Sequence, residues 1–408
     1  MNFDDTADEA AYRAEARVWI GQHAPDLSIL TADERRMWSP RHKAVARAWQ
    51  ATKAEAGYAC IAWPEAWGGA GGTAMQEAIF VQEEARAGLQ FTYYMTGLQM
   101  LLPALLTFNR DPGSLALVPP AVRGDSIWCQ LFSEPSSGSD SAAVRCMAVQ
   151  DGEDWVLDGQ KVWNSAAQFA DYGLVITRTN VDVPKHQGLT AFWIDMKTPG
   201  VDVRPIKMMT GESEFNEVFL SSVRVPDCQR VGEVGGGWKV VIATLMNERT
   251  ALGGGTGLSW RDIMRLARQT PGWGSPVMED PAFHEWLADW YVAAEGVRLL
   301  RFQTLSQISR GATPGSESSA AKLLWATQTQ ALASQALDML DAYGLIDDPA
   351  IAPLAGAFQH RFLWAPGLRL GGGTDEIMKN IIAERVLGLP GDIRLDKSVP
   401  FKDVPTGA

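Results

Sequence analysis

Small residues and hydroxyl groups gather in the segment from Leu131 to Asp140, which reads Leu-Phe-Ser-Glu-Pro-Ser-Ser-Gly-Ser-Asp. The residues from Ser136 to Ser139 leave their backbone N–H groups unhindered and add hydroxyl groups. Unhindered amides and hydroxyls suit the binding of a phosphate-bearing ligand. The alternative is a serine-rich surface turn that binds nothing. We call residues 133–140 the cradle.

An indole and a hydroxyl follow in the run Gly159-Gln-Lys-Val-Trp-Asn-Ser165, at Trp163 and Ser165. The run is typical of a β-strand, in which side chains two positions apart lie on the same face. We therefore expect Trp163 and Ser165 to contact one planar ligand together. A phosphate-binding cradle with an aromatic wall beside it favours a dinucleotide that carries a large ring system.

The composition is that of an ordinary globular protein, with 46% apolar and 21% charged residues. A length of 408 residues favours two or three domains. The formal net charge of -12 argues against a nucleic-acid partner, which normally requires a basic face, and against binding to an anionic membrane surface.

The cysteines are widely spaced, without a Cys-x-x-Cys pair or a histidine at metal-ligand spacing; they are Cys60, Cys129, Cys146 and Cys228. We expect free thiols in a reducing cytoplasm and no metal site. The most apolar stretch, residues 98–108, contains Pro103 and is too short to span a membrane. The acidic N-terminus argues against a secretory signal, which begins with a positively charged region.

The elements that must position these residues occur in three blocks. Helical periodicity predicts an N-terminal α-helical domain over residues 1–122, and short β-type runs between turn residues predict a middle antiparallel β-barrel or sandwich over 123–234. Long amphipathic segments predict a C-terminal four-helix bundle over 235–395, followed by a tail, 396–408. The fold class is therefore α+β and multidomain.

The chain resembles the acyl-CoA dehydrogenase family, and the matching phrases lie in order along the sequence. They are Ser133-Glu-Pro-Ser-Ser-Gly-Ser-Asp140, Leu157-Asp-Gly-Gln-Lys-Val-Trp-Asn-Ser165, Phe215-Asn-Glu-Val-Phe219, Val223-Arg-Val-Pro226 and Gly372-Gly-Thr-Asp-Glu-Ile-Met-Lys-Asn-Ile-Ile-Ala-Glu-Arg385. The resemblance implies FAD between the β-domain and the C-terminal bundle, α,β-dehydrogenation of an acyl-CoA thioester, and electron transfer to an electron-transfer flavoprotein. It also implies a homo-oligomer, a dimer or tetramer, with a heteromer as an alternative.

The resemblance also implies roles for individual residues. It places Leu131 and Ser133 at the flavin pyrimidine edge and Trp163 and Ser165 beside the isoalloxazine. The other implied contacts are Gly138 and Ser139 at the pyrophosphate, Thr374 and Glu376 at the adenosine half, and Ser139 and Arg249 at the CoA substrate. The sequence departs from the usual phrases at Ser136-Ser137, commonly Gly-Ala, and at Asn164 and Ala166, commonly Thr and Gly. The adenosine-binding phrases Arg-x-x-Phe-Gly and Gln-x-x-Gly-Gly are not found.

The catalytic base is displaced relative to most of the family. Most members carry a carboxylate immediately before the Gly-Thr of the C-terminal phrase, where this chain has Gly372. Glu248 lies in an apolar stripe with Val241, Leu245 and Leu252, spaced as one helix face. A carboxylate there is either paired with a cation such as Arg249 or functional.

A minority branch, which includes isovaleryl- and long-chain-type enzymes, takes its base from this helix just before an arginine. The dipeptide Glu248-Arg249 matches that pattern. We expect Glu248 to abstract the α-proton while N5 of FAD takes the β-hydride. Two alternatives stay open: a non-catalytic or half-site subunit of a heteromeric enzyme, and a flavin oxidase or monooxygenase on the same fold.

Overall fold

The computed structural model describes residues 4–31, 34, 39–89, 91–251, 258–269, 277–309, 315–394 and 396–404. The chain divides into two compact units. The sheet unit comprises Glu15–Pro25, Trp38–Ala251 and Asp392–Ala408, and the bundle unit comprises Met1–Ala14, Asp26–Met37 and Leu252–Gly391.

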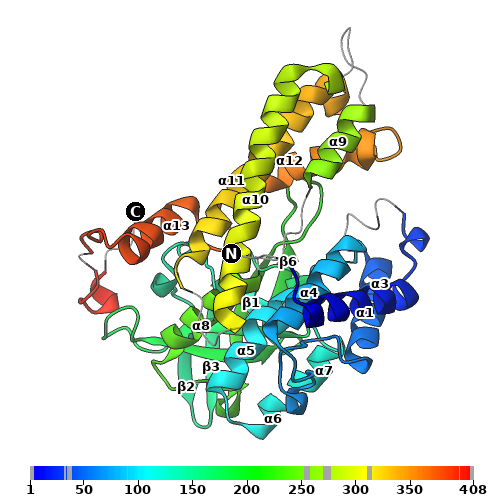
Figure 1. Cartoon of the computed structure of the whole chain (residues 1–408). Coiled ribbons are helices and arrows are strands. Elements are labelled where there is room, and N and C mark those ends of the chain that lie inside the picture. The colour runs from blue at the N-terminus through cyan, green and yellow to red at the C-terminus, as the bar shows by residue number, and fades with distance from the viewer. Residues whose placement is uncertain are drawn as a thin grey trace. The chain divides into compact units, whose positions relative to one another are not determined.

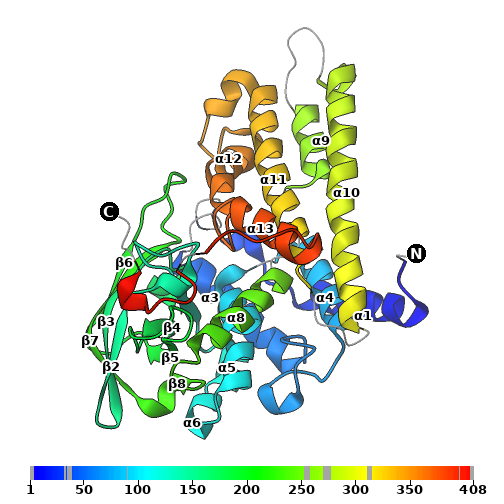
Figure 2. The ribbon, with the colours of Figure 1, turned by 90° about the vertical axis from the view of Figure 1, so that its left-hand side faces the viewer.

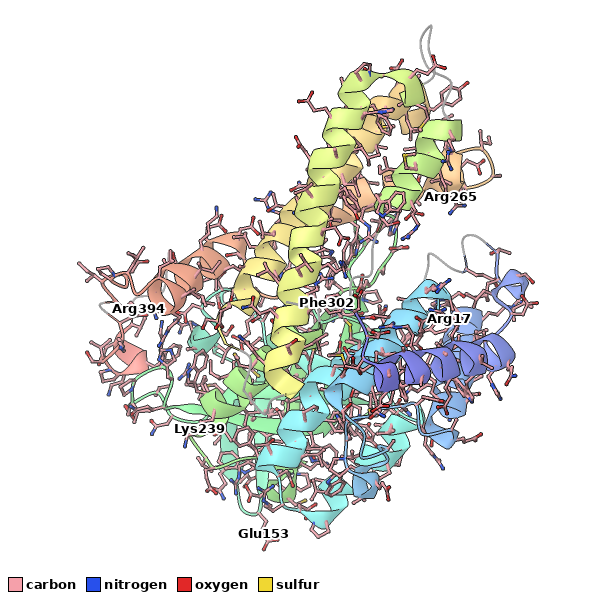
Figure 3. All side chains as sticks on the ribbon, viewed as in Figure 1. Arg17, Glu153, Lys239, Arg265, Phe302 and Arg394 are labelled. Carbon is pink, nitrogen blue, oxygen red and sulfur yellow. The ribbon has the colours of Figure 1, made fainter. Side chains whose placement is uncertain are left out.

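The N-terminal part of the chain is helical, and capping residues mark where some of its helices begin. These are α1 (Ala7–His23), α3 (Pro40–Glu55), α4 (Ala74–Arg86), α5 (Leu102–Phe108), α6 (Pro112–Leu115) and α7 (Val118–Val122), with a π-helix at Thr96–Leu101. Helix α3 begins after the N-cap Ser39, and α4 begins with a capping box of Thr73 and Gln76. Arg17 of α1, labelled in Figure 3, forms an ion pair with Glu83 of α4 at 2.8 Å, which holds these helices together.

The middle of the chain forms a mixed sheet of eight strands within the described residues. The strands are β1 (Trp128–Leu131), β2 (Met147–Asp151), β3 (Asp154–Lys161), β4 (Tyr172–Arg178), β5 (Leu189–Asp195), β6 (Val201–Pro205), β7 (Asn216–Pro226) and β8 (Arg230–Val231). The order is β6-β7-β3-β2-β4-β5-β8, and β1 pairs with β4. Figure 1 labels β1, β2, β3 and β6 of this sheet. Most pairs are antiparallel as expected, but β1–β4 and β2–β4 are parallel. Strand β1 enters the sheet from helix α7 instead of through a hairpin, which allows the parallel pairing.

Strands β4 and β5 are buried on both faces, which explains their continuous apolar runs. Leu174 and Ala191 pack into a core shared with the N-terminal helices and with α8 (Gly237–Ala251). Their neighbours Val175 and Phe192 point the other way, into the core between the strands. These two strands therefore form the layer to which the rest of the sheet unit is attached.

The bundle unit is built around α11 (Ser318–Leu340). It contacts α10 (Pro281–Ser309), α12 (Ala357–Leu368), α13 (Asp375–Ile381) and, less extensively, α9 (Trp260–Gln269). Figure 2 shows α10 and α11 running side by side. The helical N-terminal, sheet and helical C-terminal architecture expected from the sequence is confirmed. Across the helices described, none has both the length and the apolar character that crossing a membrane requires.

The boundary of one predicted strand is wrong. Asp158-Gly159 is one of the turn-type pairs that separate the predicted β-runs, but β3 runs through it with a β-bulge between Leu157 and Gly159. A Cβ atom on Gly159 would lie 2.7 Å from the Cα atom of Cys146, so glycine is required by close packing and not by a turn. 

We expect Phe192→Ala to lower the free energy of unfolding by about 3–5 kcal/mol, because it empties a fully buried site between the strands. The measurement is urea denaturation followed by circular dichroism. Val149→Ala, in β2 with 59% of the side chain exposed, is the matched control and should change stability by less than about 0.5 kcal/mol. Equal losses from the two substitutions would contradict this account of the core.

Candidate active site

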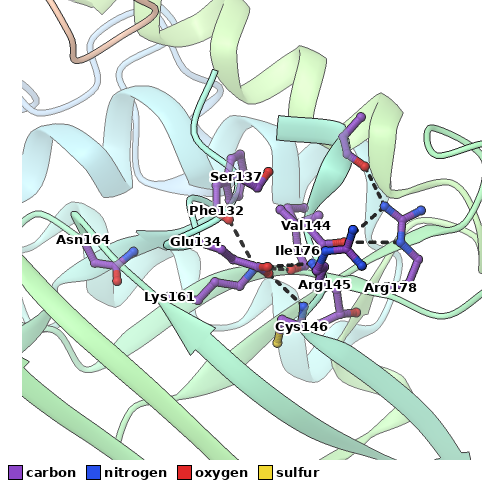
Figure 4. Close-up of polar contacts among 12 residues, drawn as sticks. Phe132, Glu134, Ser137, Val144, Arg145, Cys146, Lys161, Asn164, Ile176 and Arg178 are labelled. Carbon is purple, nitrogen blue, oxygen red and sulfur yellow. Dashed lines mark hydrogen bonds and ion pairs between the residues drawn. The ribbon is translucent and has the colours of Figure 1, made fainter. Parts of the chain in front are cut away.

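A fully buried lysine lies beneath the cradle. Lys161 ends β3, and its ammonium donates hydrogen bonds to the carbonyls of Phe132 at 3.2 Å and Ile176 at 2.6 Å and to Glu134 Oε1 at 2.7 Å (Figure 4). An ammonium has three N–H donors, so its hydrogen-bonding capacity is used in full. The lysine therefore joins β3 and β4 to the first residues of the cradle.

Glu134 connects the start of the cradle to the chain that follows it. Its carboxylate also accepts the backbone N–H groups of Arg145 at 2.6 Å and Cys146 at 2.9 Å (Figure 4). Its own N–H and carbonyl pair with those of Ser137 at 2.9 and 3.0 Å. The carboxylate is buried and accepts three hydrogen bonds, which compensates for the loss of water around it.

The exposed part of the cradle offers free hydrogen-bond donors. Among the described residues, the backbone N–H groups of Ser136, Gly138 and Ser139 have no acceptor, and the Ser133 and Ser139 hydroxyls have no partner. A Cβ atom added at Gly138 would meet nothing within 4 Å, so the space around it is open. Unpaired amides and hydroxyls in an open loop match the donor set that a pyrophosphate requires.

Trp163 is held in an exposed position next to the cradle. The N–H of Val162 donates to the Ser133 carbonyl at 3.0 Å, which brings the two predicted site segments together. The Trp163 side chain is 60% exposed, although its edge-to-face contact with Phe215 has a ring-centroid distance of 6.2 Å. An exposed indole on a fixed backbone is suited to stacking on a planar ring.

The prediction that Trp163 and Ser165 share a strand face is wrong. Strand β3 ends at Lys161, and Trp163 adopts φ of +61°, which breaks the strand alternation. Asn164 stabilises this kink, because its side chain donates to the Gln130 carbonyl at 2.8 Å and its N–H to the Asn216 carbonyl at 3.1 Å. The Ser165 hydroxyl is half-buried and has no partner within the described residues.

Leu131 lies beside the cradle but faces inward. Its side chain is fully buried in the core between the strands, so contact with a ligand at this residue has to come from the backbone. Its assignment to the flavin edge stays a prediction.

The C-terminal phrase lies in the bundle unit, where it runs from a glycine turn into α13 and the π-helix Ile382–Val386. Thr374 caps α13 by accepting the N–H of Ile377 at 3.2 Å, and Glu376 is exposed in the first turn. Gly372 has φ of +65°, a conformation that strains any residue with a side chain. Thr374 and Glu376 remain predicted adenosine contacts.

Glu248 and Arg249 lie in α8, but their side chains are outside the described residues. The preceding part of α8 is well packed: Val241 is buried, Leu245 packs against the same core, and Thr244 bonds to the Val240 carbonyl at 2.9 Å. The catalytic role of Glu248 and the substrate contact of Arg249 therefore stay predictions.

Three family models match the chain along most of its length. They are the N-terminal domain of acyl-CoA dehydrogenase over residues 6–125, its middle domain over 129–223 and its C-terminal domain over 235–387. The chain belongs to the acyl-CoA dehydrogenase family. It is accordingly an oxidoreductase of a flavin-dependent family that acts in fatty-acid and lipid metabolism.

Similar proteins include two acyl-CoA dehydrogenases of Mycobacterium tuberculosis. The chain is 33% identical to IpdE1, over 95% of this chain and 99% of the relative, and 36% identical to FadE34 over 84% of this chain. It spans only 46% of the length of FadE34. The solved structure of the Tcur3481-Tcur3483 steroid ACAD is similar with a TM-score of 0.83 and 28% identity, over 96% of this chain and 100% of that one.

The buried ion pair of Lys161 and Glu134 was not predicted from the sequence. Lys161 and Glu134 stand in two of the matching phrases, but their contact is tertiary. The sequence contains one sign of this pair, a lysine within an apolar strand. A lysine at such a position needs an ion-pair partner if it is buried. Sequence reasoning also missed Lys185, which bonds to Asp140 of the cradle at 2.6 Å.

We expect Lys161→Met to lower the free energy of unfolding by about 3–5 kcal/mol, because it leaves the Glu134 carboxylate buried without its cation. The double variant Lys161→Met/Glu134→Gln removes both charges. Its loss in free energy of unfolding should be clearly smaller than the sum of the losses in Lys161→Met and in Glu134→Gln. Denaturation of the three variants measures this coupling. Additive losses would show that the two side chains do not act as a pair.

Proposed function

We propose that the protein catalyses FAD-dependent α,β-dehydrogenation of an acyl-CoA thioester to the trans-2-enoyl-CoA. The observation that carries the proposal is the position of the exposed Trp163 indole beside the cradle, whose donors are unpaired. The hydrogen bond from Val162 to Ser133 joins the two segments, and the chain belongs to this family. An electron-transfer flavoprotein is the proposed electron acceptor.

The residues of the sheet unit fit FAD. Gly138 and Ser139 would bind the pyrophosphate through amides that have no acceptor among the described residues, and Ser133 and Ser165 would offer their hydroxyls to the flavin ring. Trp163 would cover the ring and exclude water from it. When bound, FAD supplies the acceptor for the hydride that leaves the β-carbon.

Glu248 is the proposed base that takes the α-proton. Removal of a proton next to a thioester carbonyl needs a carboxylate within hydrogen-bond reach of that proton. Gly372 has no side chain to offer at the position used by most of the family, and its backbone conformation disfavours one. The packed turns of α8 before Glu248 would hold this carboxylate in a constant position.

We expect the purified protein to carry FAD and to lose its flavin absorbance when a saturated acyl-CoA is added without oxygen. In Glu248→Gln, the rate of this bleaching should fall about 100- to 10 000-fold, the range for losing a positioned general base. Stopped-flow absorbance over a panel of acyl-CoA thioesters measures it. Glu233→Gln, an exposed carboxylate just before α8, is the matched control and should bleach like wild type. Unchanged bleaching in Glu248→Gln would refute the assignment.

We expect Trp163→Ala to raise the Kd for FAD by about 3- to 10-fold, the scale of one aromatic stacking contact. Because the side chain is 60% exposed, the free energy of unfolding should change by less than about 1 kcal/mol. Titration of the flavin-free protein with FAD measures the Kd, and Trp163→Phe should restore most of the affinity. A large loss of stability without loss of affinity would assign Trp163 a structural role.

A second candidate function is that of one subunit in a heteromeric acyl-CoA dehydrogenase. Two observations favour it. Position 372 is a glycine, and the chain is similar to the Tcur3481-Tcur3483 steroid ACAD, whose name joins two proteins. Purification of this chain alone separates the two candidates. Stoichiometric FAD with turnover would exclude dependence on a partner, whereas substoichiometric FAD restored by a partner chain would support it.

A further inference from the structure

The chain returns to the sheet unit at its C-terminal end and docks there. Residues 396–404, which we call the tail segment, follow the region of Arg394 labelled in Figure 3. The N–H groups of Phe401 and Lys402 donate to the carbonyls of Val183 and Val181 at 2.9 and 3.0 Å. The tail segment is therefore paired with the loop between β4 and β5.

One anchor of the tail segment is an aromatic ring on a buried guanidinium. Arg178 is fully buried and donates to the carbonyls of Ala142, Val144 and Lys185, which fastens the chain directly after the cradle (Figure 4). The ring centroid of Phe401 lies 3.7 Å from this guanidinium. Burial lowers the pKa of Arg178 to about 10, and the Phe401 ring over the guanidinium stabilises its charge by a cation–π contact.

The second anchor is an ion-paired lysine shared between the tail segment and the cradle. The Lys185 ammonium, with only 9% of its side chain exposed, contacts Asp140 at 2.6 Å and also Asp396. Asp140 is the last residue of the cradle, and Asp396 belongs to the tail segment. The hydrogen bond from Lys185 holds the pKa of the Asp396 carboxyl below its usual range. The carboxylates of Asp140 and Asp396 therefore share one cation.

We propose that the tail segment is a positioning element for the cradle, acting through Lys185. The identity of the cradle's ligand rests on the function proposed above. The cradle is held at its start by Lys161 on Glu134 and at its end by Lys185 on Asp140. Lys161 is fixed by strands, whereas Lys185 lies in a loop: Arg178 holds its backbone carbonyl, and its ammonium is held on the tail-segment side by Asp396.

The physical reason is entropic. The residues from Pro135 to Ser136 and from Gly138 to Ser139 are exposed, whereas Ser137 between them is buried and bonded to Glu134 and to the Asp140 carbonyl. The order of the exposed residues therefore depends on Glu134 and Asp140, which the two lysines hold. A ligand that binds a mobile loop has to order it, and this lowers affinity in proportion to the disorder removed. A tail segment that holds Lys185 in place removes that cost before the ligand arrives.

The test is Asp396→Asn in the full chain, with Asp403→Asn as the matched control. Asp403 lies in the same tail segment and is exposed, and its substitution changes the charge equally without touching Lys185. In flavin-free protein, hydrogen exchange of the backbone amides of Ser137 and Ala143, which donate to the carbonyls of Glu134 and Asp140 in the cradle, should rise about 3- to 10-fold in Asp396→Asn, the scale of one partly exposed charge-assisted contact. The control should exchange like wild type.

Titration with FAD is the second measurement. Its Kd should rise about 3- to 10-fold in Asp396→Asn and by less than about twofold in Asp403→Asn. Phe401→Leu, which removes the ring from Arg178, should change both quantities in the same direction. Unchanged exchange of the cradle in Asp396→Asn, or faster exchange with an unchanged Kd, would overturn the proposal.

The outcomes also separate this proposal from the proposed function. Wild-type protein that binds no FAD would refute the function, while the exchange measurement would still decide whether the tail segment orders the cradle. If Asp396→Asn loses its far-UV circular dichroism and is therefore unfolded, Asp396→Glu, which keeps the charge, is the deciding variant. Restored folding with wild-type exchange in Asp396→Glu supports the charge-mediated anchor. Failure to restore them overturns it.

Discussion

A single buried ammonium organises the candidate active site. Lys161 has lost all contact with water, and a charge in that environment is tolerated only when its hydrogen bonds are complete. The three acceptors are the carbonyl of Phe132, just before the cradle, the Glu134 carboxylate within it and the carbonyl of Ile176 in β4. The need to satisfy one cation therefore brings β3, β4 and the cradle together at a single point. Glu134 extends that point to the chain after the cradle through two backbone amides.

The two-sided burial of β4 and β5 supplies the rigid layer behind this point. One face of these strands packs on the strand core, and the other packs on the N-terminal helices and α8. As a result, the cradle and the helix that carries the candidate base belong to the same compact unit. The reaction proposed above requires the groups that accept the hydride and the proton to be held at constant positions, and a shared core would provide that constancy. The tail segment adds a contact at the other end of the cradle.

Much of this architecture was predictable from local patterns. The runs in β4, β5 and β7 have the apolar content of strands, and the residues that α11 buries recur every three or four positions, as on one face of a helix. Strand β6 escaped prediction because it is short, exposed and ends in Pro205. The bulge at Gly159 escaped because Asp-Gly is the usual turn signal, and the packing against Cys146 that requires glycine is not local.

The sequence by itself determined the family, the three-part architecture and the segments from which a cofactor site would be built. Those follow from composition, periodicity and phrases of adjacent residues. Only the tertiary structure decided the conformation of Trp163, which departs from the strand geometry because Asn164 is held by the Gln130 and Asn216 carbonyls. It also decided which lysine meets which carboxylate, at separations of 27 residues for Lys161–Glu134 and 211 for Lys185–Asp396. Contacts between residues so far apart depend on how whole strands and the C-terminal end of the chain pack, and no local pattern encodes that.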